Sequence, residues 1–590
     1  MYVKRHTVYK GNRKYVYLRL VEAYRNETGQ VRHRLLYTLG REDQLKASGQ
    51  LDQLAASFTR LDPPPIGTRR TVGPLLLISH YLKRLDLVEL VDGIIPMRGR
   101  SLLTHGEVIS ALVANRLCSP LPLYDISGWA SSAAVSELLG APASLLNDDR
   151  LGRALDVLAP VAEDLRGRLL LSTCQRFEIN ASRLHLDLTA VRFSGVYQDS
   201  ELVKKGWAAD RTIKRQVKTI QATTKEGVPL YFKPHQGSKS ELPSFMSAID
   251  TLATSLPPGL LVVADSGLGY LESLCSADCA NVSFVVPLRS DTGWASRFRS
   301  DLLGGLDALE PLRYCSYREE QLPQKDRTQW KGVLRPFVVT SSSGKVHDFR
   351  VAYIFSSEEA LSVSDARERA LKKAEEALSR IRNGLGGRYY KTQKQIDAKV
   401  AQILTDPISG LIEVSTAHRE GKPYIAWHRD EAAIAQASAL DGLYGLATNL
   451  RDPGEGELSA LEVLKIYKDQ WIVEQRHRDL KQTLRVRPVF LHNDNRIEAL
   501  ICVIGISLLV FGLIEAELRG ALGEGVSLPG ILPEGRAAKP TARAALSVFD
   551  GLSATYTKDG LMLDHLTRIQ RTILGLLDIP LPWPEQKGED

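Results

Sequence analysis

Strand-like and helix-like segments alternate along residues 183–290, and their order restricts the sheet that this part of the chain can form. Three strand-like segments come first, then a helix, then two further strands, in the order SRLHLDLTAVRF, KRQVKTIQATT, VPLYFKPHQ, SELPSFMSAIDTLATSL, LLVVADSG and VSFVVPLRS. Three early strands, a helical crossover and then further strands match the opening of a known mixed sheet in which the first and fourth strands are parallel neighbours. We therefore expect an α/β fold with a mixed sheet.

This strand order is typical of a ribonuclease-H-like sheet, and it brings two carboxylates together. Asp187 lies within the first strand and Asp265 at the end of the fourth. A third carboxylate, Glu474, lies on a predicted helix in the segment YKDQWIVEQRHRDLK. Hard oxygen ligands of this kind suit a pair of divalent cations, which can support in-line attack on a phosphodiester. Taken singly, each Asp could instead cap a helix or a turn.

The predicted helix that carries Glu474 has a regular seven-residue pattern. Tyr467, Glu474 and Lys481 recur at this interval, so that all three would share one helix face. A carboxylate between a phenol and an ammonium group suits a metal ligand with phosphate-binding neighbours. A solvated helix with ordinary salt bridges is the alternative. Beyond Lys481, Arg485 continues the basic edge.

Composition and other motifs exclude several classes of protein. Six scattered cysteines fit a reducing cytosol without disulfides, and Cys275 and Cys279 have no partner pair nearby that would complete a zinc site. The N-terminus has no signal-peptide core, and the apolar run at 499–514 is shorter than a membrane span, so we expect a buried helix and a cytoplasmic protein. Phosphate-binding and dinucleotide-binding loops are missing from the sequence, so we expect no nucleotide cofactor.

Positive charge is concentrated at the N-terminus. Residues 1–41 contain ten Lys or Arg and two acidic residues, although the net charge of the 590-residue chain is only +7. Residues 13–39 alternate apolar and polar positions around NETGQ, which predicts a small antiparallel sheet. Its basic face is either a phosphate-facing surface or simply a solvated one.

Together these residues resemble the DDE transposases of bacterial insertion sequences, in the group with a Y-x2-R-x3-E-x6-K signature and a β-rich insertion domain. Tyr467, Glu474 and Lys481 match the signature, LHLDLT and VADSGLGY match the two aspartate strands, and YRNETGQVRHRLLYTLGR is similar to the group's opening segment. The loop GWAADRTIKRQ at 206–216 is only loosely similar. Gln470 departs from the signature, which has Arg there.

The resemblance implies the activity and the partners. We expect a homodimer that binds double-stranded terminal inverted repeats, cleaves at the element ends and joins 3′-hydroxyls to target DNA. Asp187, Asp265 and Glu474 would be catalytic and would bind Mg²⁺ (or Mn²⁺), with two ions in each active site. The residues expected to contact DNA are Tyr467, Gln470, Arg478, Lys481 and Arg485, with Arg478 supplying the charge that Gln470 lacks. An insertion-domain tryptophan, Trp427 or Trp330, would stabilise a flipped base if a hairpin forms.

The resemblance also divides the chain into regions and leaves two other functions open. We expect a basic β-rich module (1–65), an α-helical DNA-binding or dimerisation module (70–180), the first part of a catalytic domain (183–290), a β-rich insertion domain (291–445), the last part of the catalytic domain (446–515) and a C-terminal tail (516–590). The protein would act at the bacterial nucleoid, without a membrane partner. A non-catalytic DNA-binding descendant and a hydrolytic nuclease of the same fold are the alternatives.

Overall fold

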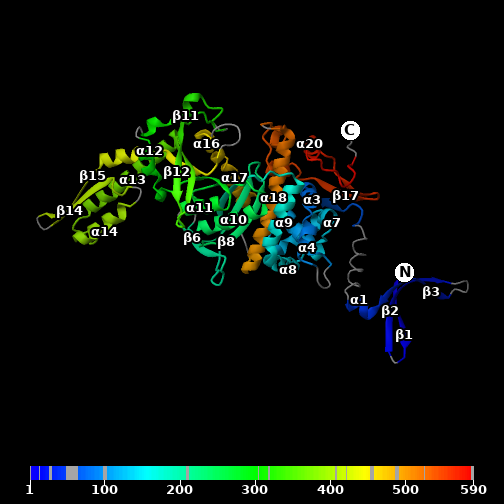
Figure 1. Ribbon diagram of the computed structural model, residues 1–590. Coiled ribbons are helices and arrows are strands. Elements are labelled where there is room, and N and C mark those ends of the chain that lie inside the picture. The colour runs from blue at the N-terminus through cyan, green and yellow to red at the C-terminus, as the bar shows by residue number, and fades with distance from the viewer. Residues whose placement is uncertain are drawn as a thin grey trace. The chain divides into compact units, whose positions relative to one another are not determined.

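The computed structural model describes residues 2–11, 13–25, 30–47, 64–96, 102–207, 212–302, 305–316, 319–405, 408–419, 422–451, 458–484, 491–523 and 525–586. The chain forms two compact units (Figure 1). Unit 1 comprises Met1–Asn180, Thr189–Ser238 and Gln475–Asp590, and unit 2 comprises Ala181–Leu188 and Lys239–Glu474.

A small antiparallel sheet begins unit 1. Its strands β1 (Tyr2–Lys10), β2 (Arg13–Arg25) and β3 (Val31–Arg41) pair in that order, and the short helix α1 (Glu42–Ala47) follows. Leu18 and Val21 are its buried apolar side chains, whereas the other described apolar residues of the sheet are more exposed. The alternation in the sequence correctly predicts this sheet, which also includes β1.

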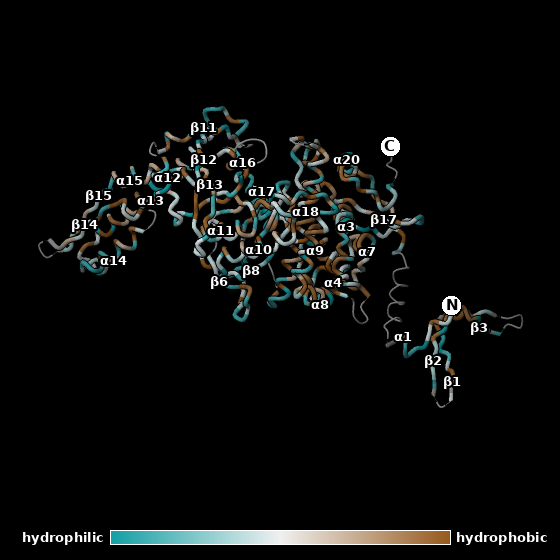
Figure 2. Tube along the Cα trace, viewed as in Figure 1, coloured by the Kyte–Doolittle hydropathy of each residue, from teal (hydrophilic) through white to brown (hydrophobic). Residues whose placement is uncertain are grey.

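The core of unit 1 forms around one long apolar helix, α18 (Asp494–Leu522). It packs against strand β8 and against helices that include α5, α8, α9 and α3, and its brown colour in Figure 2 marks its hydrophobic character. Among the described residues α18 alone is long and apolar enough to cross a membrane, but 94% of its most apolar stretch is buried inside the fold. The prediction of a buried helix at 499–514 is confirmed.

The α-helices described between β4 (Arg69–Thr71) and β5 (Arg183–Arg192) in unit 1 have 5–15 residues each. They are α3 (Leu75–Arg84), α4 (Leu87–Ile94), α5 (His105–Cys118), α6 (Ile126–Ser132), α7 (Val135–Leu139), α8 (Asp148–Leu158) and α9 (Ala162–Arg176). A capping box between Thr104 and Glu107 fixes the start of α5, because each side chain accepts a hydrogen bond from the other's backbone N–H.

The segment that the sequence predicts to be a tail is folded. Helices α19 (Ala542–Ser547) and α20 (Arg568–Leu576) pack against α18, and β17 (Ser553–Thr557) pairs with β18 (Gly560–Leu563) and with β4 (Arg69–Thr71). Partners of β17 and α18 come from the other end of the sequence, so residues 516–590, which the sequence marks only as a C-terminal tail region, contribute folded elements to unit 1.

The remaining strands of unit 1 form two antiparallel hairpin connections. β6 (Lys204–Trp207) pairs with β7 (Ile213–Thr224), and β7 pairs with β8 (Pro229–Gln236). β5 (Arg183–Arg192) begins in unit 2 and ends in unit 1. Along the sheet the order is β8-β7-β5-β9-β10, which is the ribonuclease-H-like order expected from the sequence.

Unit 2 contains the parallel centre of this sheet. The first half of β5 pairs in parallel with β9 (Leu261–Ala264), which pairs in parallel with β10 (Ser283–Pro287). All four residues of β9 are buried, as expected of a strand with neighbours on both edges. Helices α10 (Glu241–Ser255), α11 (Leu271–Cys279) and α12 (Trp294–Asp301) connect the strands.

The region predicted to be a separate β-rich insertion instead divides into two parts. β16 (Leu443–Thr448), β13 (Val346–Ser356), β12 (Trp330–Thr340) and β11 (Glu310–Leu312) extend the main sheet beyond β10 in antiparallel order. The smaller part has its own apolar core, formed by α13 (Ser357–Asn383), α14 (Gln393–Ile403), β14 (Ile412–Arg419), β15 (Lys422–Arg429) and α15 (Glu431–Ser438). Residues 291–445 are thus not a single β-rich insertion.

Candidate active site

Asp187 and Asp265 lie at matching positions on neighbouring strands. The parallel register of β5 and β9 ends with the pair Leu186 and Ala264, so that each aspartate is the next residue. Both side chains are half-buried. The backbone N–H of Leu188 donates to Asp187 Oδ1 over 2.7 Å, and that of Gly267 donates to Asp265 Oδ1 over 2.8 Å. The expected adjacency of the two aspartate strands is confirmed.

Gly267 leaves no room for a side chain beside Asp265. A Cβ atom at this position would lie 2.9 Å from Asp265 Oδ1 and 2.9 Å from Cε2 of Phe245. Both distances are shorter than carbon contacts in proteins allow, so a side chain here would move the carboxylate or the ring. The sequence analysis does not identify Gly267, although a Gly two residues after a strand-end Asp is the available signal.

The phenol of Tyr467 is influenced by the charges of all three candidate carboxylates. It belongs to α16 (Ala460–Lys468), whose start is fixed by a capping box between Ser459 and Glu462. Burial, and then the negative charges of Asp265, Glu474, Glu359 and Asp187, raise the pKa of the Tyr467 phenol to about 12. The phenol is therefore near all three carboxylates and keeps its proton at neutral pH.

Glu474 lies on a second helix rather than on a continuation of α16. α16 ends at Lys468, and α17 (Trp471–Arg478) begins after a turn at Asp469 and Gln470. Lys481 is on a further short segment, the π-helical turn Asp479–Thr483. The prediction that Tyr467, Glu474 and Lys481 share one face of a single helix is therefore wrong, and the break places Gln470 between two helices.

Gln470 faces strand β5 rather than solvent. It is 8% exposed, its Nε2 donates to the carbonyl of Leu186 over 2.9 Å, and its Oε1 is 3.2 Å from Nδ1 of His185. The amide oxygen can only accept, so His185 carries its proton on Nδ1. A phosphate contact by Gln470 does not agree with this burial. The side chain instead fixes the α16–α17 turn against the strand that holds Asp187.

The other residues predicted to contact DNA follow Glu474 in the chain. Arg478 is exposed in the last turn of α17 and Lys481 is half-buried. Arg485 lies outside the described residues. A π-helical turn is rare and is often found at functional sites, which makes the position of Lys481 notable.

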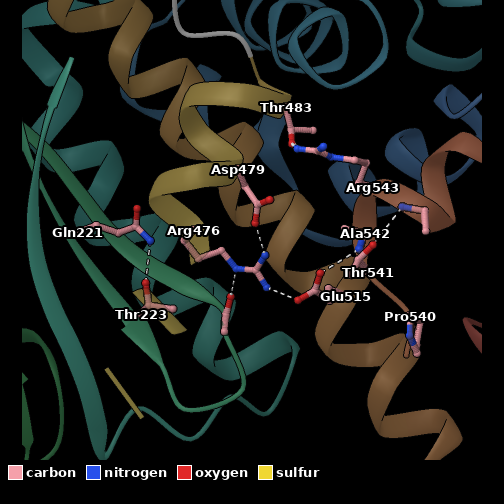
Figure 3. A network of polar contacts seen from close by, with 12 residues as sticks. Gln221, Thr223, Arg476, Asp479, Thr483, Glu515, Pro540, Thr541, Ala542 and Arg543 are labelled. Carbon is pink, nitrogen blue, oxygen red and sulfur yellow. Dashed lines mark hydrogen bonds and ion pairs between the residues drawn. The ribbon is translucent and has the colours of Figure 1, made fainter. Parts of the chain in front are cut away.

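Arg476 holds a buried ionic network in unit 1 that the sequence analysis does not identify (Figure 3). The guanidinium is 2% exposed and donates to Gly227 O, Asp479 Oδ2 and Glu515 Oε1 over 2.7, 2.7 and 2.6 Å. Arg519 pairs with the same Glu515 over 2.8 Å. Burial raises the pKa of Asp479 despite the attraction of Arg476. The network ties the residues after Glu474 to α18 and to the β7–β8 turn.

The chemistry of the candidate ligands fits a hard divalent cation. Asp187, Asp265 and Glu474 provide carboxylate oxygens, the ligands that Mg²⁺ prefers. Burial and, after it, the negative charges of these carboxylates and of Glu359 raise the pKa of the Tyr467 phenol. In the described part of the chain, however, no three His, Cys, Asp or Glu side chains are already close enough to enclose an ion. The residues fit the cation by type, and the ion would have to draw the carboxylates together.

Comparison with known families agrees with this fold. The transposase DDE domain family matches residues 186–510, which is more than half of the chain. The chain therefore belongs to the DDE transposases. Its N-terminal residues 3–64 match the N-terminal domain of IS1634 family transposases, which makes it an IS1634-family DDE transposase. Residues 68–164 match a domain of unknown function, DUF4277, and no curated protein matches the chain.

Proposed function

We propose that the protein cleaves DNA at the ends of an insertion sequence and joins the 3′-hydroxyls to target DNA, with Asp187, Asp265 and Glu474 as the catalytic carboxylates. The observation that carries this proposal is the β5–β9 register, which brings the two aspartates to matching strand ends. The DNA substrates would be terminal inverted repeats and a target duplex, bound by a homodimer at the bacterial nucleoid.

In this mechanism the three carboxylates bind the cations and the neighbouring residues bind phosphate. Two bound Mg²⁺ ions would activate the attacking oxygen and stabilise the leaving oxygen. Tyr467 stays protonated, because its pKa is about 12, and so can donate a hydrogen bond to a phosphate oxygen. Arg478 and Lys481 supply positive charge for the phosphodiester, together with Arg485.

If cleavage passes through a DNA hairpin, we assign stacking on the flipped base to Trp427. Trp330 is 7% exposed, and Nζ of Lys468 lies 4.4 Å from the centre of its ring, so that its indole is already enclosed. Trp427 is half-buried on β15, with the Arg382 guanidinium 4.9 Å from its ring. Of the two tryptophans, Trp427 is the one we assign to stacking on a flipped base.

The proposal is tested with pre-cleaved element ends, a circular target and Mg²⁺. Joined products distinguish a transposase from a hydrolytic nuclease, which would only shorten the ends. Asp187→Ala, Asp265→Ala and Glu474→Ala should each abolish cleavage and joining but leave end binding nearly unchanged, because metal binding serves the chemical step and phosphate contacts serve affinity. If any of these variants joined ends at the wild-type rate, the substituted residue would not be a catalytic carboxylate.

The choice of cation provides a second test of the same site. Mn²⁺ should replace Mg²⁺, whereas Ca²⁺ should support end binding without turnover, because its larger and looser coordination misplaces the reacting oxygens. Efficient cleavage in Ca²⁺ alone would contradict this geometry. A non-catalytic DNA-binding descendant would bind ends and give no product with any of the three ions.

A further inference from the structure

The β6–β7 hairpin in unit 1 exposes an apolar pair at its far end. Trp207 and Ile213 are directly opposite each other in the antiparallel register. Their exposed fractions are 71% and 61%. Single exposed apolar residues are ordinary on protein surfaces, but an exposed tryptophan paired with an exposed isoleucine is a feature that a binding partner usually explains.

The base of the hairpin is rigid, so the exposed pair is held in place. Gln216 is fully buried, and its Nε2 donates to the carbonyls of Trp207 and Gly237 over 3.2 and 3.1 Å. A Cβ atom on Gly206 would lie 2.4 Å from that Nε2 and 2.4 Å from Gly237 O. This close packing requires glycine at position 206 and fixes the strand that carries Trp207.

The charge of the hairpin identifies the kind of partner. β6 and β7 contain five cationic residues and no acidic one: Lys204, Lys205, Lys214, Arg215 and Lys218. Lys205 and Arg215 are paired in the register two residues away from Trp207 and Ile213, and therefore share their face of the hairpin. The cations on this face can contact phosphates, and the apolar pair can contact stacked bases. Duplex DNA offers both, with its phosphates on the outside and its bases stacked inside.

We propose that the β6–β7 hairpin is a DNA wedge, in which Trp207 and Ile213 insert between base pairs of the element end while Lys205 contacts a flanking phosphate. This inference rests on the proposed function, since it assigns a contact with the same substrate. Apolar side chains that enter a base step unstack it and kink the duplex. The close packing of Gly206 and Gln216 holds the backbone of the hairpin base, so insertion has to order mainly the Trp207 side chain.

The test measures unstacking directly with the full-length protein. Duplexes of the element end carry 2-aminopurine at successive positions, and a chelator keeps the DNA intact. This base becomes fluorescent when it loses its stacked neighbours, so the wild-type protein should raise the fluorescence at one or two adjacent positions. Trp207→Ala should remove the increase and weaken binding about ten-fold. Trp207→Phe should restore both, because a phenyl ring can still stack.

A matched control separates the wedge from a general effect of losing an exposed apolar side chain. Leu361 is 68% exposed on α13, beside Glu358 and Glu359, so Leu361→Ala should leave binding and fluorescence unchanged. Lys205→Gln should reduce the salt dependence of binding by about one ion. A fluorescence increase that persists in Trp207→Ala, or normal binding without any increase, would overturn the wedge. Failure of the wild-type protein to bind element ends would overturn the proposed function and the wedge with it.

Discussion

At the scale of single residues, Gly267 is a position at which one methyl group would disturb a candidate carboxylate. A methyl group there would lie 2.9 Å from Asp265 Oδ1, so Gly267→Ala should displace the carboxylate and lower the rate of strand transfer at least ten-fold with little change in end binding. The assay is single-turnover joining with saturating ends. Gly167 in α9 has no atom within 4 Å of such a methyl group, and Gly167→Ala is the control that should join normally. Equal rates for the two variants would show that Asp265 tolerates displacement.

Gln470 shows how a position can look functional in the sequence and have a structural role instead. Its bonds to Leu186 and His185 predict that Gln470→Ala lowers the free energy of unfolding by about 1–3 kcal/mol, because buried groups on β5 lose their partner. Gln470→Arg should not restore joining to Arg478→Ala, since the guanidinium would replace a neutral amide in a buried site against β5 and would not reach DNA from there. Calorimetry and joining assays on the single and double variants check both statements. Rescue by Gln470→Arg would mean that the side chain reaches DNA.

His185 makes the stability of the folded protein depend on pH. Burial lowers its pKa to about 4, and its Nε2 has no hydrogen-bond partner among the described residues. The unfolded state, with a pKa of about 6.5, therefore takes up a proton first as the pH falls. The contribution of His185 to the free energy of unfolding is fully present above about pH 6.5 and is lost as the pH falls towards 4. At pH 5 the loss is roughly 2 kcal/mol. The thermal midpoint of the wild type should fall more between pH 7 and 5 than that of His185→Gln, and equal falls would contradict the prediction.

At the scale of elements, the Arg476 network links α17, α18 and the β7–β8 turn. Arg476→Ala would leave Asp479 buried without its guanidinium partner and Glu515 with Arg519 as its remaining cation, at a cost of about 3–5 kcal/mol. The expected result is a large drop in the thermal midpoint. Arg168 pairs with Asp164 at the surface, with side chains 52% and 50% exposed, so Arg168→Ala should cost less than about 1 kcal/mol. Similar midpoints for the two variants would show that the buried network contributes little to stability.

The sequence predicts local elements better than it predicts their breaks and distant pairings. The order of strands predicts that Asp187 lies next to Asp265, because it matches a ribonuclease-H-like sheet, in which the first and fourth strands are parallel neighbours. The turn at Asp469 and Gln470 is not visible in the sequence, since KDQW contains no Gly or Pro and the break depends on the bonds of Gln470 to β5. The sheet extension by β16 and β13 also escapes prediction, because β10 and β16 pair across a long stretch of sequence.

At the scale of the whole molecule, we predict that the basic N-terminal sheet contributes separately to DNA affinity. Deleting residues 1–41 removes ten Lys or Arg, so end binding should weaken and its dependence on salt should become shallower, because fewer counterions are released. Binding isotherms at several salt concentrations measure the slope. Trp207→Ala is a useful comparison, since it should weaken binding without changing the slope. An unchanged slope after the deletion would assign the sheet to dimerisation or folding.

Helix α18 has a consequence for how the chain is made. Its apolar surface is buried by α3, α5, α8, α9 and β8, which all precede it in the sequence. A ribosome therefore releases those elements long before the helix that fills the space between them emerges. A copy of the gene truncated before residue 494 would yield a protein without α18, in which the apolar faces of the elements that α18 covers are open to water. Such a product would be a substrate for chaperones and proteases, so damage late in the reading frame should remove the whole protein and not only its C-terminal part.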